Sequence, residues 1–137
     1  MRKRWHLPGD MTVDLTEEGR FDVTSGIIIA ADPAYAGGSA PHCAIKFKAK
    51  KGEWLVTFKE VGEHVASITV RHTDYLKAKP NIRLKGEVGV DTASAGFFDA
   101  KSLRGVMCMS GYSDGCYPCF VARDGKEAVA AYIVFLP

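Results

Sequence analysis

The chain has 137 residues, of which 47% are apolar and 25% are charged, and its formal net charge is +2. This length suits one globular domain, and the composition argues against a disordered chain. A charge so close to zero gives no broad basic surface, so the sequence does not indicate nucleic acid as a partner.

The first ten residues carry a basic run at 2–4 with no apolar stretch behind it, which is not the pattern of a secretory signal. All apolar runs are shorter than the roughly 18 to 20 residues that a membrane helix needs, so no membrane partner is expected. The four cysteines are too few for a disulfide scaffold. We therefore expect a cytoplasmic protein with one β domain over 1–137, in which 1–10 is a loosely ordered tail.

In chain order, the first distinct element is 26–31, an apolar run that suits a central strand covered on both faces. From 43 to 71 apolar and polar residues alternate, which predicts a three-stranded antiparallel meander with strands at 43–49, 54–59 and 66–70. The side chains expected to face the core of this meander are Ile45, Phe47, Trp54, Val56, Phe58, Ile68 and Val70.

Helical periodicity is weak, and only 73–79 and 98–103 have room for a turn or two of helix. The run 117–123 is joined through Asp124-Gly125-Lys126 to 129–135, a second segment apolar on both faces, which predicts a hairpin. Shorter candidate strands are 11–15, 20–23, 87–91, 96–98 and 105–109. Together these segments predict an all-β fold, a single-domain antiparallel β-sandwich or distorted barrel with minor helical turns.

Four aspartates lie at predicted strand ends or turns, at positions 32, 91, 99 and 114. Such side chains usually accept hydrogen bonds from backbone amides of their own turn. Alternatively, converging carboxylates bind a hard cation or divide acid and base roles. Two tyrosines near Asp114 either cover the turn or form an aromatic rim for a ligand. The candidate binding residues are therefore Asp91, Asp99, Tyr112, Asp114 and Tyr117.

Because sequential strands tend to pair, the turn at 91–99 and the loop at 110–118 are expected to lie beside each other at one end of the β structure.

The motif Cys116-Tyr117-Pro118-Cys119, with His42-Cys43 elsewhere, raises the possibility of a zinc or dithiol site. A redox CxxC opens a helix, whereas Cys119 leads into a predicted strand. Residues three apart in a strand point to opposite faces, so these two thiols neither share a metal nor pair with each other. We expect no metal site, no disulfide and no cofactor.

These segments resemble an uncharacterised, mainly bacterial family of small β-domains of unknown function. That family carries a Gly-Val-Asp-Ser-Gly segment with a nearby Asp, and a later Ser-Gly-aromatic-Gly-Asp-Gly-x-Tyr-Pro segment. This sequence departs from the pattern at Thr92-Ala93 and at Ser113. The resemblance implies a β fold and no particular activity. The matching positions are Asp32-Pro33, Gly89-Val90-Asp91, Asp99, Ser110-Gly111-Tyr112, Asp114-Gly115, Tyr117-Pro118 and Asp124-Gly125.

Two classes of function follow. Because the sequence has no cofactor fingerprint, nucleophile elbow or metal-ligand spacing, the first is a non-catalytic module that binds another protein or a small ligand. The alternative is a hydrolase-type or cation-binding site built from Asp91, Asp99 and Asp114. Under that alternative the carboxylates gather in a cleft with shifted pKa values.

Overall fold

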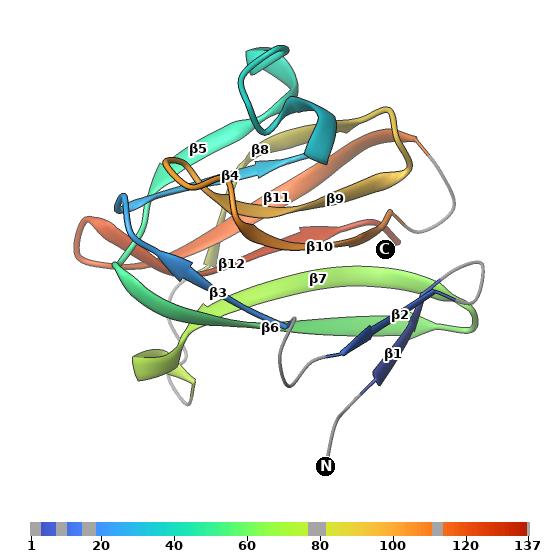
Figure 1. Cartoon of the computed structure of the whole chain (residues 1–137), viewed down its shortest axis with the longest axis horizontal. Helices are drawn as coiled ribbons and strands as arrows, with labels where there is room; N and C mark the ends of the chain where they lie inside the picture. The colour runs from blue at the N-terminus through green and yellow to red at the C-terminus, as the bar shows by residue number, and fades with distance from the viewer. Residues whose placement is uncertain (1–3, 8–10, 15–18, 77–81, 111–113, 137) are drawn as a thin grey trace.

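The computed structural model describes residues 4–7, 11–14, 19–76, 82–110 and 114–136, which form an all-β structure (Figure 1). Within these ranges, three one-turn 3₁₀ helices interrupt the strands, namely η1 (Pro33–Tyr35), η2 (Pro41–Cys43) and η3 (Thr73–Tyr75). The described strands are β1 (Arg4–Leu7), β2 (Met11–Asp14), β3 (Arg20–Val23), β4 (Ile27–Ala31), β5 (Ile45–Lys48), β6 (Gly52–Val61), β7 (His64–His72), β8 (Ile82–Val90), β9 (Ser94–Asp99), β10 (Gly105–Met109), β11 (Gly115–Asp124) and β12 (Glu127–Val134).

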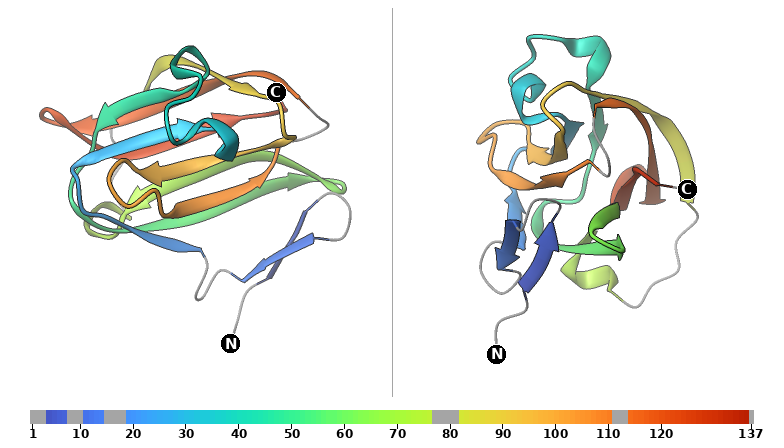
Figure 2. Two further views of the ribbon diagram at one scale, coloured as in Figure 1. Left: turned by 45° about the horizontal axis from the view of Figure 1, so that its top comes forward. Right: turned by 90° about the vertical axis from the view of Figure 1, so that its right-hand side faces the viewer.

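Two sheets stack face to face, as the views in Figure 2 show. The larger sheet has the order β3-β6-β7-β12-β11-β8, and the smaller has the order β10-β9-β4-β5. Neighbouring strands in both sheets are antiparallel. β10 contacts β3 at one edge of the stack and β5 contacts β8 at the other. The predicted antiparallel sandwich is therefore confirmed, and the two sheets do not close into a barrel.

The first strand pair stands outside these sheets, because β1 pairs only with β2. Four of the residues that the sequence assigned to a tail, Arg4–Leu7, thus form a strand in the structure.

The core between the sheets follows the period of two. On β6 the side chains of Trp54, Val56 and Phe58 are buried, whereas Thr57 and Lys59, on either side of Phe58, are exposed. Of the seven predicted core residues, six are buried and Ile45 is partly buried and packs against the core. One cluster of buried side chains draws on both sheets, so the apolar alternation predicted the faces of these strands correctly.

The predicted three-stranded meander over 43–71 is wrong at its first strand. β6 and β7 form the expected hairpin, but β5 pairs with β4 in the smaller sheet. The chain crosses between the sheets at Ala49 and Lys50, whose amides donate to the carbonyls of Gly26 and Ala128. Alternation of apolar residues indicates which face of a strand is buried but not which strand it pairs with, so this pattern cannot reveal a crossover.

Both segments predicted to be central strands are central. β4 lies between β9 and β5, and β12 lies between β7 and β11. The predicted hairpin between β11 and β12 is also present, with Gly125 at a φ of 67° in the turn. Glycine suits this turn because it adopts a positive φ without steric cost.

The helical expectations are partly confirmed. η3 occupies the start of 73–79, and 77–79 lie outside the described residues. No helix forms over 98–103, where β9 runs to Asp99 and a turn follows. Across the described residues, no helix is both long enough and apolar enough to cross a membrane.

Candidate functional site

Asp32, which follows β4, is the centre of a hydrogen-bonded junction between two loops. Its carboxylate accepts bonds from the amides of Asp91 and Thr92 at 2.8 and 2.7 Å. The hydroxyl of Thr92 donates to it at 2.7 Å, and the amide of Ala34 caps η1 through it at 2.8 Å. The side chain is fully buried. Burial alone would raise the pKa of Asp32, but these hydrogen bonds outweigh burial and lower the pKa below its usual value.

The turn between β8 and β9 lies against the segment that follows β10. The amide of Ala93 donates to the Asp114 carboxylate at 2.8 Å, and the amide of Ser110 donates to the carbonyl of Ala93 at 2.9 Å. Gly115 also pairs with Val90, the last residue of β8. The predicted neighbourhood of the 91–99 turn and the 110–118 loop is confirmed for 91–93, 110 and 114–115.

Tyr35 joins this junction from η1. Its hydroxyl donates a short hydrogen bond to the carboxylate of Asp91. This bond, together with partial desolvation and the charge of Asp91, raises the pKa of Tyr35 to about 12. Asp91 is exposed and Tyr35 is half-buried, so the phenol ring and the carboxylate are both present at the surface.

Tyr117 lies at the same end of the molecule, and its side chain mainly contacts other parts of the protein. Its ring meets the ring of Phe135 edge to face, with centroids 5.2 Å apart. Its hydroxyl lies 3.5 Å from the carbonyl oxygen of Asp114. Tyr112, the other predicted rim residue, lies outside the described residues. We call the surface formed by Tyr35, 91–94 and 114–117 the loop platform.

Asp99 lies away from the loop platform. It ends β9, the strand that begins at Ser94, and five residue steps along a strand span about 17 Å. The structure therefore brings Asp91 and Asp114 to one end of the sandwich and places Asp99 at the other.

The Asp99 carboxylate accepts six hydrogen bonds and is fully buried. Four come from the amides and hydroxyls of Thr24 and Ser25, and two come from the amides of Lys101 and Ser102. Burial would raise the pKa of Asp99, but the bonds from Ser102, Ser25 and Thr24 outweigh it and hold the pKa well below its usual value.

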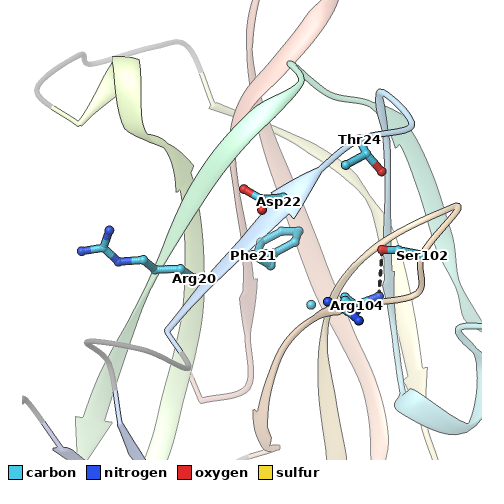
Figure 3. Close-up of a pocket in the computed structure, with 7 residues that line it drawn as sticks. Arg20, Phe21, Asp22, Thr24, Ser102 and Arg104 are labelled. Carbon is cyan, nitrogen blue, oxygen red and sulfur yellow. Dashed lines mark hydrogen bonds between the residues drawn. The ribbon is translucent and has the colours of Figure 1, made fainter.

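A hollow of about 860 Å³ opens beside Asp99, at the edge where β3 meets β10. Figure 3 shows that the Arg20 side chain points away from the other lining residues. Its Nη1 atom lies 3.4 Å from Oε1 of Glu53. Arg104 comes from the other side of the hollow, and its amide donates to the hydroxyl of Ser102. The two guanidinium groups therefore do not converge on one point.

The cysteines fit the strand interpretation. Cys116 and Cys119 both lie on β11, the first exposed and the second fully buried. Burial raises the pKa of Cys119 to about 12, so this thiol is protonated and inert at neutral pH. Within the described ranges, no group of three or more His, Cys, Asp or Glu side chains is placed to hold a metal ion.

Sequence reasoning did not choose two members of this junction, Tyr35 and Thr92. It considered Asp32 among the four aspartates, as a turn former or a converging carboxylate, but did not include it in the candidate binding residues. The signal for Asp32 was Asp-Pro directly after a buried strand, the pattern of a capped helical turn. The contacts of Asp32 to residues 91 and 92 join positions about sixty apart in the chain, so no local motif marks them.

Comparison with known proteins gives no relative, because no family model, curated protein or solved structure matches this chain. The resemblance to a bacterial family of unknown function therefore stays a prediction.

Proposed function

We propose that the protein is a non-catalytic binding module that recognises another protein through the loop platform. The observation that carries this proposal is the Asp32 junction. One buried carboxylate joins the start of η1 to the turn after β8, and Asp114 extends the connection to the start of β11. Loops fixed in this way lose little conformational entropy on binding, which favours recognition by a preorganised surface.

The charge of the loop platform suggests the chemistry of the partner. Asp91 and Asp114 are exposed carboxylates at one end of the sandwich. Asp91 accepts a hydrogen bond from Tyr35 with one oxygen, and its carboxylate is exposed, so a partner donor can reach it. The half-buried ring of Tyr35 lies beside it and offers an apolar surface. An arginine or lysine side chain on an exposed segment of the partner suits this combination, because it pairs with carboxylates and packs on aromatic rings.

The alternative of a hydrolase-type or cation-binding site built from Asp91, Asp99 and Asp114 has less support. Asp99 lies at the opposite end of β9 and its oxygens already accept six hydrogen bonds. The three carboxylates therefore do not converge, and no observation on the described residues favours catalysis over binding.

We also propose a cytoplasmic location. Cys108 and Cys119 are single buried thiols and Cys116 is an exposed free thiol, an arrangement suited to a reducing compartment. A bacterial origin rests on the family resemblance alone.

The proposal is tested by NMR titration of the ¹⁵N-labelled protein with short peptides that differ only in a central Arg, Lys, Gln or Glu. We expect amide shifts at 91–94 and 114–117 with the Arg and Lys peptides only. Asp91→Asn should weaken binding of the Arg peptide about fivefold, the scale of one exposed charge pair.

The matched control for this titration is Asp22→Asn, which removes an exposed carboxylate from β3 at the opposite end of the sandwich. It should leave the affinity for the Arg peptide unchanged. Equal shifts with the Arg and Glu peptides, or an equal loss in both variants, would contradict recognition by the loop platform.

A further inference from the structure

A cavity of about 360 Å³ lies on the outer face of the smaller sheet, beneath the segment that joins β4 to β5. Figure 2 shows this segment, which carries η1 and η2, standing beside the smaller sheet. The volume falls within the range of small-molecule sites. The apolar lining consists of Ile29, Ala36, Gly38, Pro41 and Ala44.

The floor of the cavity is a large apolar side chain that small residues of the covering segment almost completely bury. Ile29 lies on the face of β4 that turns away from the core, yet it is only 3% exposed. The covering segment is fixed by backbone bonds from Tyr35 to Asp32 and from Gly38 to Tyr35. Gly38 has a φ of 97°, which disfavours any residue with a side chain. The apolar surface left open to a ligand belongs to Pro41, Ala44 and Tyr35, which are exposed or half-buried.

Two polar side chains complete the lining, and only one of them is charged. Tyr35 contributes its ring, while its hydroxyl is already committed to Asp91. Lys46 is the cross-strand neighbour of Ile29 and is exposed at the cavity. No acidic side chain in the described ranges pairs with Lys46. The site therefore combines apolar walls with one unneutralised ammonium group.

We propose that this cavity binds a small carboxylate with an apolar body, whose anionic group pairs with the Lys46 ammonium. The apolar body replaces water against Pro41, Ala44 and the ring of Tyr35, which is the favourable term, and the charge selects an anion over a neutral analogue. The cavity shares Tyr35 with the loop platform, but its other lining residues lie outside that surface, and binding of the carboxylate does not require the protein partner.

The test compares hexanoate with hexanamide, which has nearly the same shape and no charge, by calorimetry and NMR at pH 7. Hexanoate should bind in the millimolar range or tighter and about five- to tenfold more tightly than hexanamide. Its contacts should appear as shifts at residues 29, 36, 44 and 46. Absence of binding, equal affinity for the two probes, or shifts confined to other residues would overturn the proposal.

Three variants sharpen this test. Lys46→Met keeps the apolar stem and should abolish the preference for hexanoate. Lys48→Met is the matched control, because Lys48 lies two residues further along β5 and does not line the cavity. Ala44→Leu should fill the cavity and remove binding of both probes while the melting temperature shows that the fold persists. If Lys48→Met lowers the preference as much as Lys46→Met, or Ala44→Leu binds hexanoate normally, the assignment is wrong.

Discussion

Asp32 and Asp99 are two buried carboxylates at strand ends, and each holds loops together at its own end of the sandwich. Each accepts hydrogen bonds from loop amides and hydroxyls, and each has a pKa lowered by those bonds. Asp99 accepts hydrogen bonds from residues 24–25 and 101–102 with both of its oxygens, and its own carboxylate does not reach the surface. The junction at Asp32 instead holds two exposed carboxylates, Asp91 and Asp114, above it.

The comparison separates two roles of aspartate that look alike in sequence. A carboxylate that is buried and hydrogen-bonded stabilises loops, whereas an exposed one beside it lies where a ligand can contact it. If this division is correct, substitutions of the buried pair change stability most, and substitutions of the exposed pair change binding most.

The largest effect is expected for Asp99→Ala, which leaves six donors without their acceptor. These bonds are part-buried and their acceptor is fully buried, so we expect a loss of about 3–4 kcal/mol in the free energy of unfolding. Urea denaturation measures it. Asp22→Ala, at an exposed position on β3, should change stability by less than about 0.5 kcal/mol. Similar losses in both variants would show that the Asp99 bonds contribute little.

Asp32→Ala should cost about 2–3 kcal/mol, because four donors lose a buried acceptor. It should also loosen the 90–93 turn, which amide hydrogen exchange of Asp91 and Thr92 will detect as faster exchange. Unchanged exchange at both amides, despite lower stability, would contradict a role for Asp32 in fixing the loop platform.

Stability should fall at acid pH through these same two groups. Both folded-state pKa values lie below the unfolded value of about 3.9, so their contribution is complete above that pH and is lost as the pH drops below it. Melting temperatures measured from pH 6 to pH 2 test this. The Asp99→Asn variant should show a shallower decline than wild type, and a parallel decline would contradict the assignment.

The smallest effect is expected at Asp114, which accepts a bond from the amide of Ala93 at the surface. Asp114→Ala should cost about 0.5–2 kcal/mol, the scale of a lost cap, whereas Asp114→Asn should be milder because Asn accepts the same bond. Thermal melts distinguish the two. Equal melting temperatures for wild type and Asp114→Ala would show that this side chain does not hold its loop and would strengthen a purely functional role.

The sequence predicted the faces of the strands better than their partners. The alternation of apolar and polar residues correctly predicted that Trp54, Phe58 and Val70 are buried, because successive side chains of a strand point to opposite faces. It assigned β5 to the wrong sheet because Lys46 and Lys48 on its outer face look the same beside β6 as beside β4.

The candidate site was predicted only in part, because local patterns mark turns and strand ends but do not show which of them lie together in the fold. Turn chemistry predicted that the loops of Asp91 and Asp114 lie close together, and they do. It grouped Asp99 with them, since Asp99 follows Asp91 by only eight positions in sequence, although a strand carries Asp99 to the other end. Tyr35 reaches Asp91 across 56 positions, a contact that only the packing of the sheets creates.

The chain changes sheet four times, after β3, β5, β8 and β10. Neither sheet is therefore made from one continuous stretch, and neither can be completed before strands from distant parts of the chain have met. Long-range pairing of this kind slows folding to the millisecond-to-second range. Small single domains also usually unfold without populated intermediates. We expect one sharp unfolding transition in which both layers are lost together, and a truncation at any crossover should leave no half of the sandwich able to fold.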